Sequence, residues 1–320
     1  MKILMTEPLQ PSGLTVFDDH PGIEVIRPKD TSEEALTQAV VGVEGIAVRS
    51  AKLTPTVLAA ATNLRAVSRH GVGYDNIDVP TLNSRSIPLM LAIHANAVSV
   101  AEHTMYFLLS LAKRGRLYDA AARRSDFAFR NAPVAIDIAD KVLVIVGFGR
   151  IGTRLAKRAC AFDMRVFVCD PYVADADIEA VGCTPVYDFR TVLPQTDFLT
   201  VHCPLNQETR HLIGADELAL MRDDSFVINC ARGGIVDEVA LAGALDADAL
   251  AGAGIDVYET EPPVQGNPLL SNEKVILSPH SAGVSIEAAR RMSFETATNL
   301  IAALEDEADP AALANPEILA

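Results

Sequence analysis

The sequence predicts an α/β protein of two domains, each organised on a parallel β-sheet. Over most of the 320 residues, short apolar segments alternate with segments whose apolar residues recur at helical spacing. Strands and helices that alternate in this way form βαβ units around a parallel sheet. A chain of 320 residues suggests about two domains, and 49% apolar residues allow each of them a substantial core.

Residues 1–96 predict a small α/β domain with a flavodoxin-like rhythm. Strands are expected at 2–6, 23–27, 45–48 and 65–68, and helices at 14–20, 32–41 and 54–61. Glu33 and Glu34 lie in the first turn of the second helix, where negative charges interact favourably with the helix dipole. Pro55 suits the first position of the third helix.

A long apolar helix is predicted over 96–114. Its apolar residues cover more than one face, so we expect it to be buried between the domains or at a subunit contact. Residues 115–139 are rich in arginine and predict a less regular arm. A final helix over 286–304 is expected to return to the first domain, which gives one domain of 1–96 with 286–320 and another of 97–285.

The stretch from 142 to 170 combines an apolar strand, three glycines, a helix and a second strand. Val142–Val146 predicts a strand that is buried on both faces of a parallel sheet. Gly147, Gly149 and Gly152 follow as G-x-G-x-x-G, with Arg150 and Ile151 between the last two. The first glycine permits a tight turn, the second lets a pyrophosphate approach the backbone, and the third allows close helix–strand packing. The helix after them offers free N–H groups to phosphates.

The second strand of this stretch, over 165–169, ends at Asp170. A carboxylate at this position can accept both ribose hydroxyls of NAD and would repel the 2′-phosphate of NADP. The sequence therefore predicts a binding site for NAD. The alternative is a glycine-rich turn of an α/β protein that binds no dinucleotide.

Reactive side chains follow the later strands of this domain, which are predicted at 198–202, 225–230, 253–257 and 275–277. Arg232 follows the second of them, Asp256 lies on the third shortly before Glu259 and Glu261, and His280 follows the fourth. Ligands of parallel sheets bind at the carboxyl ends of the strands. Arginine, carboxylate and histidine are therefore expected to converge at the nicotinamide end of the cofactor.

These motifs resemble the D-isomer-specific 2-hydroxyacid dehydrogenase family over nearly the whole chain. The resemblance rests on Gly147–Gly152 with Asp170, on Asn229–Gly234, on Asp256–Pro263 and on Pro279-His280. It implies two Rossmann-like domains, a flavodoxin-like substrate domain and a doubly wound parallel-sheet NAD-binding domain. It also implies that Arg232, Glu261 and His280 are catalytic, that Val72 and Gly73 donate backbone N–H groups to the substrate carboxylate, and that Asp256 contacts the nicotinamide amide.

These roles are chemically coherent. Protonated His280 can donate a proton to the substrate oxygen, and Glu261 beside it would raise its pKa and hold its orientation. Arg232 stays charged and can hold the substrate carboxylate while it polarises the carbonyl. Glu259 competes with Glu261 as the histidine's partner, and the position just before Pro262 favours Glu261. A purely structural His280 is the alternative.

The expected binding residues form two sets. Cofactor binding is expected at Gly147, Gly149, Arg150, Ile151, Gly152, Asp170, Cys203, Pro204, Thr209, Cys230, Ala231, Asp256 and His280. Substrate binding is expected at Arg49, Ser50, Arg69, Val72, Gly73 and Arg232. Non-catalytic roles are expected for the histidines His70, His94, His103, His202 and His211. Because these histidines lack metal-ligand spacing, no metal is expected.

Arg49 and Arg69 are similar to residues of the phosphoglycerate dehydrogenase and hydroxypyruvate reductase branch, whose substrates include one with a second anion. They favour a small D-2-hydroxy or 2-keto acid such as 3-phosphoglycerate, hydroxypyruvate or a sulfolactate-like acid. Surface or interdomain pairing is the alternative for both arginines. The chain ends near residue 320, so a C-terminal regulatory domain is expected to be absent.

Composition limits the partners. A net charge of −15 argues against nucleic acid and anionic membranes. Five cysteines without a C-x-x-C and a start without a signal-peptide pattern favour a cytoplasmic protein with reduced thiols. The resemblance implies a homodimer. Two other functions stay open, an NAD-sensing corepressor-like interaction protein and a formate dehydrogenase relative.

Overall fold

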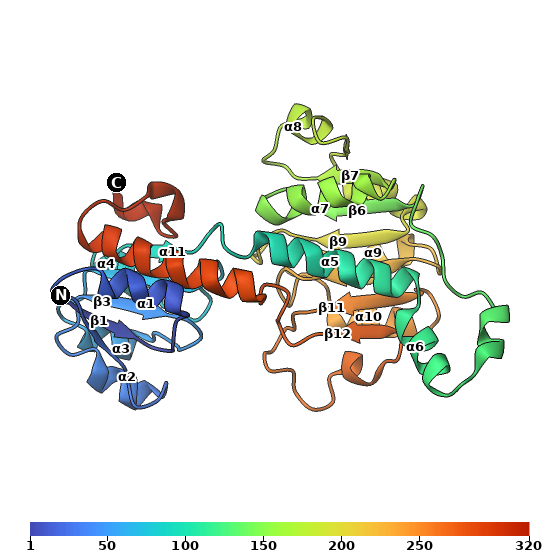
Figure 1. Ribbon diagram of the computed structural model, residues 1–320. Helices are drawn as coiled ribbons and strands as arrows, with labels where there is room; N and C mark the ends of the chain where they lie inside the picture. Colours follow the sequence, from blue (N-terminus) through green and yellow to red (C-terminus); the bar gives the residue numbers. More distant parts are fainter. Residues whose placement is uncertain (320) are drawn as a thin grey trace. The chain divides into compact units, whose positions relative to one another are not determined.

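The structure, a computed structural model that describes residues 1–319, divides into two compact units (Figure 1). The first contains Met1–Asn96 and the chain from Val284 onwards, and the second contains Ala97–Gly283. Each unit has its own parallel sheet, of five strands in the first and seven in the second. The predicted α/β fold class with two parallel sheets is confirmed. Within residues 1–319, no helix is long and apolar enough to cross a membrane.

The first unit has the flavodoxin-like strand order β2-β1-β3-β4-β5, and every neighbouring pair is parallel. Its elements are β1 (Lys2–Met5), α1 (Pro11–Asp18), β2 (Glu24–Ile26), α2 (Glu33–Ala39), β3 (Gly45–Val48), α3 (Pro55–Ala60), β4 (Ala66–Arg69), α4 (Val79–Ser84), β5 (Leu89–Leu91), α11 (Ile286–Leu304), η4 (Pro310–Ala312) and η5 (Pro316–Leu319). Helices α1 and α11 pack together on one side of the sheet, and α2 and α3 pack together on the other (Figure 1). The strand order reverses between β1 and β3, so a ligand is expected at the carboxyl ends of these two strands.

The second unit has the strand order β12-β11-β10-β9-β6-β7-β8. Its elements are α5 (Ala97–Ala112), α6 (Gly115–Arg123), η1 (Phe127–Asn131), β6 (Val142–Val146), α7 (Arg150–Ala161), β7 (Arg165–Cys169), α8 (Asp175–Glu179), β8 (Thr184–Pro185), η2 (Phe189–Gln195), β9 (Phe198–Val201), α9 (Ala215–Leu220), β10 (Phe226–Asn229), α10 (Glu238–Asp246), β11 (Gly252–Ile255), η3 (Pro268–Ser271) and β12 (Val275–Leu277). The order reverses between β6 and β9. The glycine loop follows β6, so it lies at the reversal where doubly wound sheets bind their ligands.

Helix α5 packs in the core of the second unit. Phe107, Leu108 and Leu111 are buried in the core of the second unit, in one cluster with Phe198 and Phe226. Packing within its own domain therefore accounts for much of the apolar character of α5. The arm after it is more regular than expected, because α6 forms a helix and η1 adds a short 3₁₀ segment.

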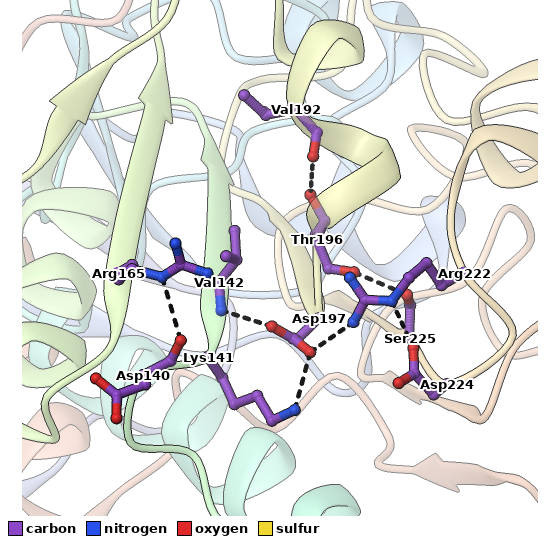
Figure 2. Close-up of polar contacts among 10 residues, drawn as sticks. All are labelled: Asp140, Lys141, Val142, Arg165, Val192, Thr196, Asp197, Arg222, Asp224 and Ser225. Carbon is purple, nitrogen blue, oxygen red and sulfur yellow. Dashed lines mark hydrogen bonds and ion pairs between the residues drawn. The ribbon is translucent and has the colours of Figure 1, made fainter.

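A buried carboxylate at the amino ends of the central strands aligns the second sheet (Figure 2). Asp197, whose side chain is 8% exposed, accepts the Val142 N–H at 2.7 Å and pairs with Lys141 at 3.3 Å and Arg222 at 2.7 Å. Ser225 adds a bond to the Thr196 carbonyl at 2.8 Å. A buried charge with two cationic partners and a backbone donor is well compensated. This network ties β6, β9 and β10 together at the end of the sheet opposite to the reactive side chains.

Candidate active site

The glycine loop after β6 has the geometry of a pyrophosphate-binding turn. Gly147 has φ +99°, and a Cβ there would come within 2.7 Å of the Cys203 backbone nitrogen. A Cβ at Gly152 would lie 2.2 Å from the Gly147 carbonyl oxygen, whereas one at Gly149 would meet nothing within 4 Å. The first and third glycines are thus required by the protein's own packing. The second leaves open space at the N-terminus of α7, where a phosphate is favoured.

Asp170 follows β7 and lies beside this loop. Its Oδ2 accepts the Phe148 N–H at 2.6 Å, and its Oδ1 accepts the Tyr172 N–H at 2.9 Å. An ionised carboxylate has about four acceptor positions, so these two bonds leave capacity for ribose hydroxyls. The arrangement fits the expected NAD-binding role.

The loops after β9 and β10 contain five further expected cofactor-binding residues, namely Cys203, Pro204, Thr209, Cys230 and Ala231. Thr209 donates its hydroxyl to the Pro204 carbonyl at 2.6 Å and accepts the Asn206 N–H at 2.8 Å, so it shapes its own loop. Burial raises the pKa of the Cys203 thiol to about 11, and burial also raises the pKa of the Cys230 thiol far above its usual value. Both thiols stay protonated near neutral pH. They are therefore unsuited to nucleophilic chemistry.

Three reactive side chains come from the loops after β10, β11 and β12, which are neighbours in the sheet. Nδ1 of His280 lies 2.7 Å from Oε2 of Glu261, and Oε1 of Glu261 accepts the Tyr258 N–H at 3.1 Å. Arg232 donates from Nη1 to the Ala231 carbonyl at 2.7 Å. Its charge also acts on Glu261. The structure therefore gathers Arg232, Glu261 and His280 at one edge of the sheet.

The pKa of Glu261 lies below its usual value although burial by itself raises it. The hydrogen bonds from His280 and the Tyr258 N–H, together with the charges of His280 and Arg232, outweigh burial. Glu261 is therefore a carboxylate near neutral pH, which is the form that orients an imidazole. Glu259, the competing partner, lies 3.0 Å from His211 instead.

Gly233 allows two loops of the site to pack closely. A Cβ at Gly233 would lie 1.9 Å from the Tyr258 carbonyl oxygen, so this glycine lets the Arg232 loop pack against the backbone that leads to Glu261. A side chain at this position would separate the two loops.

Asp256, which is 1% exposed, holds the loop that contains His280. Its carboxylate accepts the Ser281 N–H at 2.8 Å, the Ala282 N–H at 3.0 Å and the Ser278 hydroxyl. Its carbonyl accepts the His280 N–H at 2.8 Å. His280 has φ +51°, in the left-handed region that costs a non-glycine residue about 1 kcal/mol or more. Asp256 therefore restrains the backbone of the reactive histidine, and it does so with Ser278, a residue that sequence reasoning missed.

A carboxylate in the first unit, Glu7, also escaped sequence reasoning. It follows β1 and accepts the backbone N–H groups of Arg49 at 3.0 Å, Ser50 at 2.6 Å and Ala51 at 2.8 Å. It also accepts the Ser50 hydroxyl at 2.7 Å. Glu7 thus fixes the loop after β3 at the strand-order reversal, and it engages both donors of Ser50, an expected substrate-binding residue.

Arg49 and Arg69 lie near each other in the first unit. Both positive charges, after burial itself, lower the pKa of His70 to about 4. Arg69 donates to the His70 carbonyl, and a Cβ at Gly71 would lie 3.1 Å from its Nη1. The two arginines therefore place positive charge beside the loop that continues into Val72 and Gly73. Within residues 1–319, no group of three or more His, Cys, Asp and Glu side chains is placed to hold a metal ion.

Comparison with known proteins defines the class of the chain. The family model for the NAD-binding domain of D-isomer specific 2-hydroxyacid dehydrogenases matches residues 105–282, more than half of the sequence. The chain therefore belongs to the D-isomer specific 2-hydroxyacid dehydrogenase family. Its second unit is the NAD-binding domain of that family, and its cofactor is NAD.

Particular relatives show which branches are similar. The chain is 37% identical over 292 residues to the D-3-phosphoglycerate dehydrogenase of Methanocaldococcus jannaschii, across 91% of the chain and 55% of that protein. It is 31% identical to the hydroxypyruvate reductase of Thermotoga maritima, across 92% of the chain and 95% of that protein. The structure of a D-lactate dehydrogenase from Aquifex aeolicus with NAD and lactic acid matches with a TM-score of 0.84 and 26% identity, across 96% of each chain. The chain spans about half the length of the phosphoglycerate dehydrogenases that it matches.

Proposed function

We propose that this protein is an NAD-dependent D-2-hydroxyacid dehydrogenase that interconverts a small 2-hydroxy acid and its 2-keto acid. The observation that supports this best is the His280–Glu261 pair at 2.7 Å, with the Arg232 charge acting on the same carboxylate. Histidine, carboxylate and arginine at the ends of three adjacent strands supply a proton donor, its orienting base and an anion-binding fork.

The proposed roles follow from the chemistry of each side chain. Bound NADH supplies a hydride for the carbonyl carbon of the keto acid. His280, protonated, gives its proton to the carbonyl oxygen as negative charge develops there, and in the reverse direction neutral His280 accepts it. Glu261 accepts a hydrogen bond from the Nδ1–H group of His280. The other ring nitrogen, Nε2, is therefore the atom that faces the substrate. Arg232 binds the substrate carboxylate and polarises the carbonyl.

The proposed substrate has a second anionic group, such as a phosphate, a sulfonate or a distal carboxylate. Arg49, Arg69 and the backbone of Val72 and Gly73 are the proposed substrate-binding residues of the first unit. For the two arginines, support comes from their positive charges, which both act at His70. Arg49 also follows β3, at the strand-order reversal, and Val72 and Gly73 lie in the loop after β4. A relative named for phosphoglycerate is consistent with a second anionic group, whereas the relative named for hydroxypyruvate, which has one carboxylate, is consistent with a small keto acid in general.

A screen of NADH oxidation over 2-keto acids, with and without a second anionic group, tests the proposal. We expect turnover of at least one member, and a loss of about a hundredfold or more in kcat for His280→Ala. NAD binding without turnover of any keto acid would favour the corepressor-like alternative. Oxidation of formate with no reduction of keto acids would favour the formate dehydrogenase alternative.

A further inference from the structure

His103 on α5 is hydrogen-bonded to the loop that contains His280. Its Nε2 lies 3.0 Å from the Ser278 hydroxyl, and Ser278 follows β12 directly, two residues before His280. The His103 ring packs edge-on against Phe107 with centroids 4.5 Å apart. Helix α5 itself is packed on the sheet of the second unit. The side chain of His103 therefore connects helix α5 to the loop that contains His280.

The direction of the hydrogen bonds in this chain can be assigned. Ser278 has a single hydroxyl proton, which it donates to the Asp256 carboxylate. A hydroxyl that donates to a carboxylate must accept from its other partner, so Nε2 of His103 bears a proton. Burial lowers the pKa of His103, and the opposing charge of Asp256 does not reverse this. The neutral tautomer with the proton on Nε2 satisfies every bond in the series.

Asp256 connects the Ser278 hydroxyl to the backbone around His280. The oxygen that accepts the Ser278 hydroxyl, Oδ1, also accepts the Ser281 N–H at 2.8 Å. Oδ2 accepts the Ala282 N–H at 3.0 Å, and the carbonyl accepts the His280 N–H at 2.8 Å. The orientation of this one carboxylate therefore helps to keep His280 at φ +51°. Ser278 and His103 fix that orientation from the helix side.

We propose that His103 is a positioning residue for His280, acting through Ser278 and Asp256. The proposal rests on the proposed function of His280 as proton donor. His103 touches neither cofactor nor substrate in this account. Its effect is to hold the backbone of the reactive loop, so it should influence the chemical step more than substrate binding.

Two substitutions at His103 separate the hydrogen bond from the packing. His103→Phe keeps the aromatic contact with Phe107 and removes the N–H, whereas His103→Gln keeps an N–H donor. We expect kcat to fall about tenfold in the phenylalanine variant at an unchanged KM for the keto acid, and to stay near the wild-type value in the glutamine variant. A phenylalanine variant with wild-type kcat, or one that changes only KM, would overturn the proposal.

A double-mutant cycle with Ser278→Ala tests the route. If His103 acts through Ser278, the double variant His103→Phe/Ser278→Ala should lose no more kcat than the larger of the two single losses. Losses that multiply would show that His103 acts by another path. His280→Ala separates a failure of the proposed function from a failure of this inference. Turnover that survives in His280→Ala would overturn the proposed function. An inactive His280→Ala together with a wild-type kcat in His103→Phe would overturn only the role of His103.

Amide hydrogen exchange gives a readout that needs no turnover. The N–H groups of His280, Ser281 and Ala282 all donate to Asp256 and should be protected in the wild-type protein. We expect their exchange to accelerate about tenfold in His103→Phe and not in His103→Gln, while amides of β6 keep their wild-type rates. Equal protection in all three proteins would contradict the proposal even if kcat changed.

Discussion

Glu261 binds the backbone with one carboxylate oxygen and His280 with the other. Oε1 accepts the Tyr258 N–H at 3.1 Å, and Oε2 lies 2.7 Å from Nδ1 of His280. The backbone bond fixes the carboxylate, and the fixed carboxylate orients the imidazole ring. The pKa of Glu261 is lowered by its hydrogen bonds with His280 and the Tyr258 N–H and by the charges of His280 and Arg232, so a negative charge faces the imidazole ring at this contact.

Glu261→Gln should therefore move the pH profile of keto-acid reduction to lower pH. His280 donates a proton during reduction, and the ionised carboxylate 2.7 Å away favours the charged form of that donor. Without the carboxylate, the decline of kcat with rising pH should begin at lower pH, with kcat reduced about tenfold at neutral pH. Measured kcat–pH profiles of the wild type, Glu261→Gln and the control Glu259→Gln check this. A shift in the control alone would reassign the role to Glu259.

The Asp170 carboxylate motivates a prediction about cofactor choice. It ties the end of β7 to the glycine loop through the Phe148 N–H at 2.6 Å. Asp170→Ala should lower kcat/KM for NADH about ten- to a hundredfold, the effect of a lost charged hydrogen bond, and should change kcat/KM for NADPH little. Asp175→Ala, an exposed acidic residue on α8, is the control. A wild-type preference for NADPH would refute the role of Asp170.

The strands that border the site could be predicted because they are short apolar runs between clear breakers. The predicted strands at 142–146 and 275–277 have the bounds that the structure shows. The contacts within the loops were harder to predict from the sequence. Glu7 and the Arg49 loop, for example, are distant in sequence and meet only because of the strand order of the first unit. A three-residue strand such as β5 has too little pattern of its own to be recognised beside the long apolar helix α5.

Ser278 and His103 show the same limit within the site. Each looks like an ordinary polar residue in the sequence, and their link to Asp256 appears only once α5 packs on the sheet beside β11. Arg232, Glu261 and His280 could be proposed from the sequence because each lies in a loop after a recognisable strand and matches a family motif. The structure brings these three candidate residues together, and it adds Ser278 and His103, which the sequence did not indicate.

We propose that the protein forms a homodimer through the arm after α5. Helix α5 is used in the core of its own domain, whereas the arm exposes apolar side chains, with Leu117 51% and Phe127 69% exposed. Sedimentation should show a dimer at micromolar concentration, and Leu117→Ser with Phe127→Ser should shift it towards monomer. Val239→Ser, at an apolar residue on α10 that is 74% exposed, serves as the control. A stable wild-type monomer would contradict the prediction.

We expect Glu7 to make a pH-dependent contribution to the free energy of unfolding of the protein. Burial raises its pKa, but hydrogen bonds from Thr6, Ser50 and Arg49 outweigh burial and bring it below 4.5, its ordinary value. A group with a lowered pKa stabilises the fold above its unfolded pKa, and this contribution is lost as the pH falls through the folded pKa. Glu7→Gln should destabilise the protein by about 1–2 kcal/mol near neutral pH, because an NH2 group replaces one of the two acceptor oxygens and the charge is lost.

Thermal unfolding of Glu7→Gln and the wild type at several pH values checks this. The difference in Tm should be largest near neutral pH and should shrink as the pH falls below 4.5. Glu24→Gln, whose contact with Lys2 is a surface pair at 3.7 Å, should show little change at any pH. A Tm difference that stays constant down to strongly acidic pH would mean that the charge of Glu7 has no part in it.

Arg49 provides the sharpest test of the proposed substrate class. Its side chain is exposed, it lies in the loop that Glu7 fixes after β3, and its charge acts at His70 together with that of Arg69. A guanidinium in such a position can form paired hydrogen bonds to an oxyanion, each worth about 1.5–3 kcal/mol. Arg49→Ala should therefore lower kcat/KM for dianionic keto acids about ten- to a hundredfold, and leave pyruvate or glyoxylate nearly unchanged.

The comparison of the two substrate types is what separates substrate binding from a structural role for Arg49. A structural role would lower kcat/KM for both types equally, because it would disturb the fold or the loop that every substrate meets. Lys52→Ala, which removes an exposed cation from the same loop, controls for the general loss of positive charge. Steady-state kinetics with hydroxypyruvate phosphate and pyruvate as the paired substrates measures the difference. Equal losses on both, or a wild-type preference for an aliphatic keto acid, would show that Arg49 does not select a second anion.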